Sequence, residues 1–269
     1  MTDQFHPKRT IVTGASGELG QAMARQLARP GARLSLWGRD REKLASIAAQ
    51  CSEKGALVDV RSLDLTDVEG AVAALLAEDD ACPFDMAIFA SGLGDIRAKG
   101  ALVEDPAQVA RLIEVNFIAP AAMAAALAGR MAARNGHRKS GGRLVLISSA
   151  AAFHALPFAA SYAGSKAGLS RFTDSLRIAM RPHGVSVTLA SPGFIDTAAG
   201  RAVPGARPMP LSPKEAARRI LRAAMAGRKG MGRAHLVTPW HFALLRLFDR
   251  ALPRFLRDRL LRSLAPPGW

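Results

Sequence analysis

The chain contains a single tyrosine, Tyr162, and Lys166 follows it four residues later. Residues at this spacing lie on the same face of a helix, so the two side chains are predicted to be neighbours. A free tyrosine has a pKa of about 10, and an adjacent ammonium lowers it by favouring the phenolate. The spacing therefore predicts that Tyr162 transfers a proton near neutral pH and that Lys166 activates it.

Ser149 precedes the tyrosine, at the end of the apolar run GRLVLISS. Its hydroxyl could donate a hydrogen bond to an oxygen that gains negative charge, as an oxyanion hole does. Such a trio suits the interconversion of a carbonyl and an alcohol, with a bound cofactor carrying the hydride. His154 lies between Ser149 and Tyr162, and is expected either to line a pocket as a neutral ring or to be partly buried and hydrogen-bonded.

A glycine-rich segment, TGASGELG, follows the first apolar run of the chain. Gly14, Gly17 and Gly20 would turn the backbone into a helix and allow close approach to a ligand. The N-terminal amides and dipole of such a helix can hold a pyrophosphate. This segment predicts a dinucleotide cofactor.

The second apolar run ends in LSLWGRD, where NAD-binding proteins of this type place an acidic residue against the ribose hydroxyls. Gly38 occupies that position here, and Arg39 follows it. The change removes a negative charge and supplies a cation for a 2′-phosphate, which favours NADP. The alternative is that Asp40 turns toward the ribose and the cofactor is NAD.

These motifs need a framework, and the alternation of short apolar runs with alanine-rich helical stretches predicts one. Strands separated by helices run parallel, and such sheets carry helices on both faces. We therefore expect an α/β fold of the Rossmann type, a doubly wound and mostly parallel sheet of about seven strands. The predicted strands are 9–14, 32–38, 57–65, 84–92, 142–149, 185–193 and 234–239, and the predicted helices are 18–29, 40–54, 67–78, 105–134 and 160–181. Loops are expected at 136–142 and 200–213.

Taken together, these motifs resemble the short-chain dehydrogenase/reductase superfamily over residues 8–240. The resemblance implies a catalytic set of Asn116, Ser149, Tyr162 and Lys166, in which Asn116 of IEVNF binds a proton-relay water near a helix kink. It also implies that Asp64 contacts adenine, that SPGFIDT lines the nicotinamide and that Lys166 holds the ribose. The cofactor-binding residues implied are Gly14, Ser16, Gly17, Leu19, Gly20, Arg39, Asp64, Leu65, Gly92, Tyr162, Lys166, Pro192, Gly193, Ile195 and Thr197.

Two departures from the family pattern stand out. Glu18 occupies the middle glycine position of the loop, and Gly17 gives the spacing of the extended subclass that includes sugar-nucleotide epimerases. A carboxylate there is unfavourable beside a pyrophosphate unless it points away. The family's N-N-A-G is FASG here, which keeps only Gly92. The chain is too short for an extended-type substrate domain, so the shorter single-domain type is retained.

The function expected is NADP(H)-dependent interconversion of a ketone and a secondary alcohol, with Tyr162 as general acid and base. The substrate partner would be a small carbonyl or alcohol compound, with a hydrophobic or lipid-like one as an option. Two alternatives use the same fold: a dinucleotide sensor without catalysis, and an epimerase or dehydratase. The catalytic domain is expected at 1–239, followed by a basic extension at 240–269.

Composition limits the other partners. The formal net charge is +15, yet the arginines are scattered and lack the spacing of nucleic-acid motifs, so no nucleic-acid partner is expected. Cys51 and Cys82 lie far apart, which argues against a metal site. A homodimer or homotetramer built on helices 105–134 and 160–181 is expected, and the absence of a secretion segment at the N-terminus favours a cytoplasmic protein.

The segment 240–264, WHFALLRLFDRALPRFLRDRLLRSL, repeats apolar residues at helical spacing, with arginines on another stripe. Pro253 should kink or restart the helix. One interpretation is a helix that covers the substrate pocket or a subunit interface. The other is an interfacial helix that makes peripheral contact with an anionic membrane.

Overall fold

A computed structural model describes residues 6–135, 141–203, 205–226 and 232–263. Its centre is a seven-stranded sheet in the order β3-β2-β1-β4-β5-β6-β7, and every neighbouring pair is parallel. This confirms the predicted Rossmann-type sheet. The strands are β1 (Arg9–Thr13), β2 (Arg33–Gly38), β3 (Leu57–Ser62), β4 (Met86–Phe89), β5 (Arg143–Ile147), β6 (Ser186–Pro192) and β7 (His235–Thr238).

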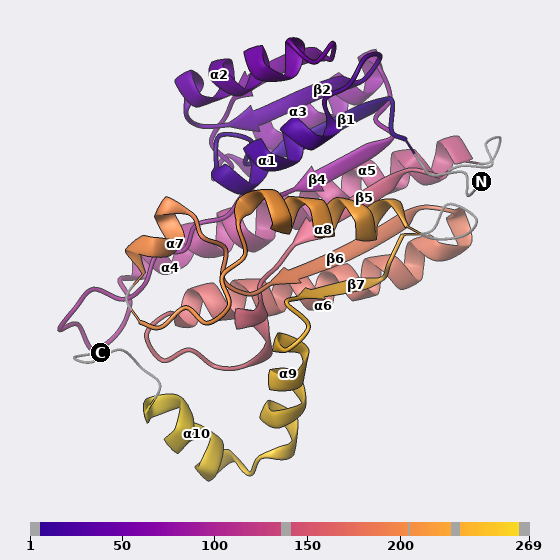
Figure 1. The fold of residues 1–269 in the computed structure, drawn as a ribbon. Helices are drawn as coiled ribbons and strands as arrows, with labels where there is room; N and C mark the ends of the chain where they lie inside the picture. Colours follow the sequence, from indigo (N-terminus) through magenta and orange to yellow (C-terminus); the bar gives the residue numbers. More distant parts are fainter. Residues whose placement is uncertain (1–5, 136–140, 204, 227–231, 264–269) are drawn as a thin grey trace.

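Helices cover both faces of the sheet (Figure 1). One face packs against α1 (Glu18–Leu27), α2 (Arg41–Ser52) and α8 (Pro213–Met225), which share one apolar core with the strands. The other face packs against α3 (Val68–Ala81), α5 (Ala119–Asn135) and α6 (Ala160–Met180), which share a second core. Because the strands are parallel, their carboxyl ends lie at one edge, where ligands bind in such sheets.

The long helix expected at 105–134 is interrupted. It consists of α4 (Pro106–Ile113), a π-helical turn at Glu114–Ile118 and α5. By length and composition, Pro106–Arg134 is also the one stretch among the described residues that could cross a membrane. Half of its most apolar window is buried inside the fold, and α5 contributes to the second core, so we interpret it as a core helix.

The segment after β7 forms two helices, α9 (Phe242–Ala251) and α10 (Arg254–Ser263), drawn in yellow in Figure 1. The break falls at Pro253, as its missing amide predicts. The prediction of a loop over 200–213 is wrong at its start. A short helix, α7 (Ala198–Ala202), forms there because Thr197 caps it by accepting a hydrogen bond from the Gly200 amide. Most of the loop expected at 136–142 lies outside the described residues.

Candidate active site

Tyr162 and Lys166 lie one turn apart on α6, as their spacing predicts. The Lys166 Nζ is 6.0 Å from the centre of the Tyr162 ring and donates a hydrogen bond to the Ile147 carbonyl at 3.1 Å. Ser149 follows β5, and its side chain is close enough to Tyr162 to lower the pKa of that hydroxyl. These three residues lie at the carboxyl end of β5, and Asn116, the fourth residue expected to be catalytic, contacts Ser165, the neighbour of Lys166.

The electrostatics of Tyr162 differ from the expectation. Burial raises the pKa of Tyr162 above its ordinary value of 10.0, and the hydrogen bond with Ser149 opposes this only in part. The spacing predicted a lowered pKa for Tyr162, whereas its pKa is raised because desolvation outweighs the effect of its polar neighbours. Lys166 is itself only 4% exposed, and burial lowers its pKa to about 8. Burial therefore favours a neutral hydroxyl on Tyr162 and makes the Lys166 ammonium lose its proton more readily.

Asn116 is fully buried in the π-helical turn. Its Oδ1 accepts a hydrogen bond from the Leu93 amide at 2.8 Å, and its Nδ2 donates to the Leu93 carbonyl at 3.0 Å and to Ser165 Oγ at 3.3 Å. The helix irregularity around this residue is confirmed. Asn116 thereby fixes the segment after β4, beside Gly92.

Two positioning contacts were not predicted. The Glu104 carboxylate accepts hydrogen bonds from the Ser161 amide at 2.8 Å and from the Ser161 hydroxyl at 2.7 Å, and so anchors the start of α6. Ser165 Oγ donates to the Tyr162 carbonyl at 2.8 Å and links that turn to Asn116. Glu104 lies 57 residues before Ser161 in the sequence. Nothing in the local pattern around either residue indicates that they meet, so the sequence offered no signal for this contact.

The glycine loop fits a dinucleotide. Gly14 has φ +71°, and a Cβ there would lie 2.7 Å from the Ser91 amide nitrogen, so only glycine is tolerated. Gly17 is the N-cap residue of α1 and provides no side-chain hydrogen bond, whereas Asp40, Asp67 and Asp105 cap later helices. Gly17 thus leaves the first-turn amides of α1 without a capping side chain, as a pyrophosphate requires, although the turn itself contains Glu18.

The end of β2 distinguishes the two cofactors. A Cβ at Gly38 would lie 2.6 Å from Ser16 Oγ, so the usual acidic side chain would require Ser16 to shift. Asp40 caps α2 through the Lys43 amide at 3.0 Å and pairs with the Lys43 ammonium at 2.9 Å. Arg39 is exposed, and no ion pair engages it within the described part of the chain. The Asp40 carboxylate is therefore engaged by Lys43, and the Arg39 guanidinium is available to a ligand.

Glu18 is held away from the loop amides by a distant contact. Its carboxylate accepts a hydrogen bond from the Ala198 amide at 2.6 Å, at the start of α7. The pKa of Arg201 in α7 is raised, chiefly by its hydrogen bond to Asp196 and in part by the charge of Glu18. Glu18 thus joins the cofactor loop to the segment after β6.

The remaining predicted cofactor residues lie at the same edge of the sheet. Asp64 is exposed and accepts a hydrogen bond from the Thr66 amide, while the neighbouring Leu65 is buried. A Cβ on Gly92 would lie 3.3 Å from both Asn116 Oδ1 and Lys166 Nζ. Leu19 packs against the first core. Pro192 ends β6, and Gly193, Ile195 and Thr197 follow it.

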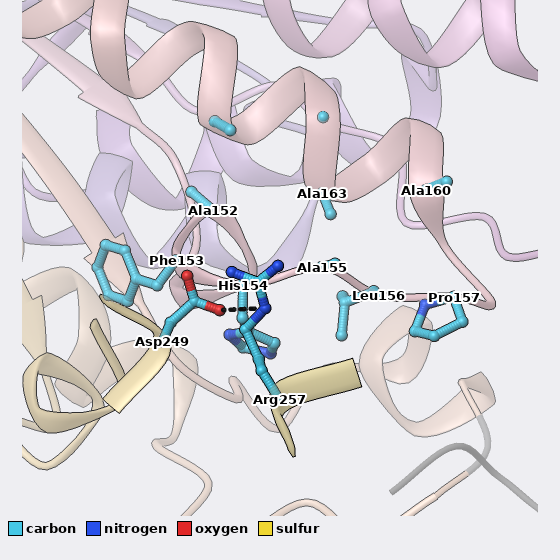
Figure 2. A pocket seen from close by; sticks show the side chains of 12 residues that line it. Ala152, Phe153, His154, Ala155, Leu156, Pro157, Ala160, Ala163, Asp249 and Arg257 are labelled. Atoms are coloured by element: carbon cyan, nitrogen blue, oxygen red, sulfur yellow. Dashed lines mark ion pairs between the residues drawn. The ribbon is translucent and has the colours of Figure 1, made fainter. Parts of the chain in front are cut away.

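A cavity of about 520 Å³ adjoins the loop between Ser149 and Tyr162 (Figure 2). Its walls are mostly apolar residues of the 152–157 loop and of α6. Asp249 of α9 and Arg257 of α10 complete them. Ser149 and Tyr162 do not line it, although Ala163 does. His154 also lines it; burial lowers its pKa, and its Nδ1 has no hydrogen-bond partner within the described ranges. The expectation that His154 lines a pocket is confirmed.

The model of the short chain dehydrogenase family matches residues 8–207. The chain belongs to this family. This short-chain dehydrogenase is 30% identical over 258 residues to an uncharacterized oxidoreductase of Myxococcus xanthus, a match covering 96% of the chain and 97% of that protein. It is 34% identical over 194 residues to dehydrogenase/reductase SDR family member 7B of Bos taurus, where 70% of the chain spans 58% of the relative.

Solved structures agree with the fold of this short-chain dehydrogenase. A short-chain dehydrogenase from Sphingobium yanoikuyae in complex with NADPH superposes with a TM-score of 0.75, at 22% identity over 96% of both chains. A metagenomic short-chain oxidoreductase in complex with NADP gives a TM-score of 0.71 at 27% identity, covering 86% of this chain and 96% of that one. The Rossmann architecture is therefore shared with both.

Proposed function

We propose that this short-chain dehydrogenase interconverts a ketone and a secondary alcohol with NADP(H), with Tyr162 as the general acid and base. The observation that carries the proposal is the grouping of the partly buried Tyr162 and Ser149 with the buried Lys166 at the carboxyl end of β5. NADPH, when bound, supplies the hydride. The Tyr162 hydroxyl donates its proton to the carbonyl oxygen, and the Ser149 hydroxyl donates a hydrogen bond to the same oxygen.

The raised pKa of Tyr162 suits the reducing direction, because the neutral hydroxyl is the form that donates a proton. In the oxidising direction Tyr162 must act as a phenolate, which the ammonium form of Lys166 stabilises. Burial lowers the pKa of Lys166 to about 8, so this help weakens as pH rises through that value. Asn116 positions the segment after β4, and we propose that it also holds a proton-relay water.

NADP rather than NAD is supported by the exposed Arg39, by the engagement of Asp40 with Lys43, and by glycine in place of an acidic residue at position 38. The metagenomic relative bound to NADP agrees with this choice. The substrate is proposed to carry apolar substituents, because Phe194, next to Gly193, is exposed and its neighbour is the ring of Phe242.

The test is NADPH oxidation with a panel of ketones of increasing chain length, followed by absorbance. Tyr162→Phe should reduce turnover by about 10²–10⁴-fold, the usual contribution of general acid catalysis, and leave NADPH binding intact. An epimerase or dehydratase would consume substrate with no net change in NADPH. Tyr162→Phe with full activity, or NADPH binding without turnover of any ketone, would contradict the proposal and favour the non-catalytic sensor.

A further inference from the structure

The α9–α10 arm exposes a set of apolar side chains that nothing within the described residues covers. No residue of α10 is buried, and Phe255 is 72% exposed. An ion pair between Arg257 and Asp249, 3.8 Å apart, joins α10 to α9. Exposed apolar patches mark interaction surfaces, and six large apolar side chains of this segment are 41–72% exposed. We define the tail surface by Trp240, Leu244, Leu247, Phe255, Leu256 and Leu260.

The tail surface belongs to the same end of the molecule as the candidate active site. The arm begins directly after β7, whose carboxyl end lies at the sheet edge shared with Ser149 and Gly193. Phe242, in the first turn of α9, packs edge-on against Phe194 with ring centres 6.0 Å apart. Figure 1 shows α10 extending from α9, away from the sheet.

The charge around the tail surface selects among possible partners. Arg254, Arg259 and Arg262 of α10 are exposed, and Asp258 is the only acidic residue of that helix. A second copy docked symmetrically on this face would bring the same arginines together, in a chain of formal net charge +15. Like charges at an interface oppose binding. A partner with a negatively charged surface and an apolar interior can bind both the arginines and the apolar side chains of the tail surface.

We propose that the tail surface docks on an anionic lipid bilayer. Its apolar side chains enter the region between headgroups and acyl chains, as interfacial helices do. The arginines extend their long side chains toward anionic headgroups. Docking places the active-site edge of the sheet next to the bilayer. This proposal concerns binding and does not depend on the reaction proposed above.

The test is co-sedimentation of the full chain with vesicles. Binding is expected to phosphatidylcholine vesicles that contain phosphatidylserine, with weaker binding to pure phosphatidylcholine or at high salt. The triple variant Arg254→Gln/Arg259→Gln/Arg262→Gln should bind about 100-fold less tightly, since each arginine near an anionic surface contributes roughly fivefold. The variant Phe255→Ser/Leu260→Ser should not sediment with either vesicle.

Leu57→Ser is the matched control, because Leu57 is 62% exposed on the edge strand β3, away from the arm. This variant should bind vesicles as the parent chain does. The proposal is overturned if the parent ignores anionic vesicles at low salt, or if Phe255→Ser/Leu260→Ser leaves binding unchanged. Failure to bind vesicles, together with a solution mass that Phe255→Ser/Leu260→Ser reduces, would show instead that a second copy covers the surface. NADPH oxidation with a water-soluble ketone, measured on each variant without vesicles, reports the proposed reaction separately.

Discussion

Replacement of Lys166 by methionine is expected to stabilise the cofactor-free fold. Lys166 is only 4% exposed, and its burial lowers its pKa from 10.5 to about 8. The folded protein therefore binds this proton less tightly than the unfolded chain does, by about 3 kcal/mol. Methionine removes that penalty but leaves the Ile147 carbonyl without its donor, which costs about 1 kcal/mol. The expected net gain at pH 7 is about 2 kcal/mol.

The pH dependence provides a second measurement. Below pH 8 both states of the parent protein hold the proton, so the penalty of Lys166 is fully present. Between pH 8 and 10.5 the unfolded chain binds more protons than the folded protein, and the Lys166 contribution to the free energy of unfolding rises with pH. This rise in the free energy of unfolding should be missing in Lys166→Met. The variant should also lose turnover, because the ammonium is gone.

Urea unfolding of the cofactor-free protein at pH 7 and pH 10 measures both effects. Lys214→Met is the control, because Lys214 is exposed at the start of α8 and its replacement should leave the stability and its pH dependence nearly unchanged. A Lys166→Met protein that is less stable than the parent at pH 7, or that keeps the full rise toward pH 10, would refute the reasoning.

Three further predictions concern the cofactor and the assembly. Arg39→Asp should shift the ratio of kcat/KM values from NADPH toward NADH by at least about tenfold, because a charge-assisted contact becomes a repulsion; equal use of both cofactors by the parent would contradict this. Glu18→Gln should speed NADPH release by roughly three- to tenfold in stopped-flow fluorescence, since the bond to Ala198 loses its charge, and an unchanged rate would separate Glu18 from cofactor retention. The protein should have the mass of a dimer or tetramer at micromolar concentration, and Ile178→Glu, at a residue 65% exposed on α6, should lower it; a parent that is already monomeric would exclude the expected assembly.

Local patterns predicted the framework of this protein and part of its site. The alternation of apolar runs and helices specified the parallel sheet, because each parallel strand needs a helical crossover. The spacing of Tyr162 and Lys166 placed both on one face of α6, because helix periodicity depends only on neighbours in sequence. The break at Pro253 followed from a missing amide.

Tertiary structure decided what depends on long-range packing and burial. Glu18 meets Ala198, and Asn116 meets Leu93, through the arrangement of whole layers around the sheet, which no local spacing encodes. The pKa of Tyr162 is raised rather than lowered because desolvation inside the fold outweighs its polar neighbours. Residue types and spacing thus determined which groups could react, whereas the depth at which the fold buries them determined their protonation, because the free energy of a charge depends on the solvent that packing removes.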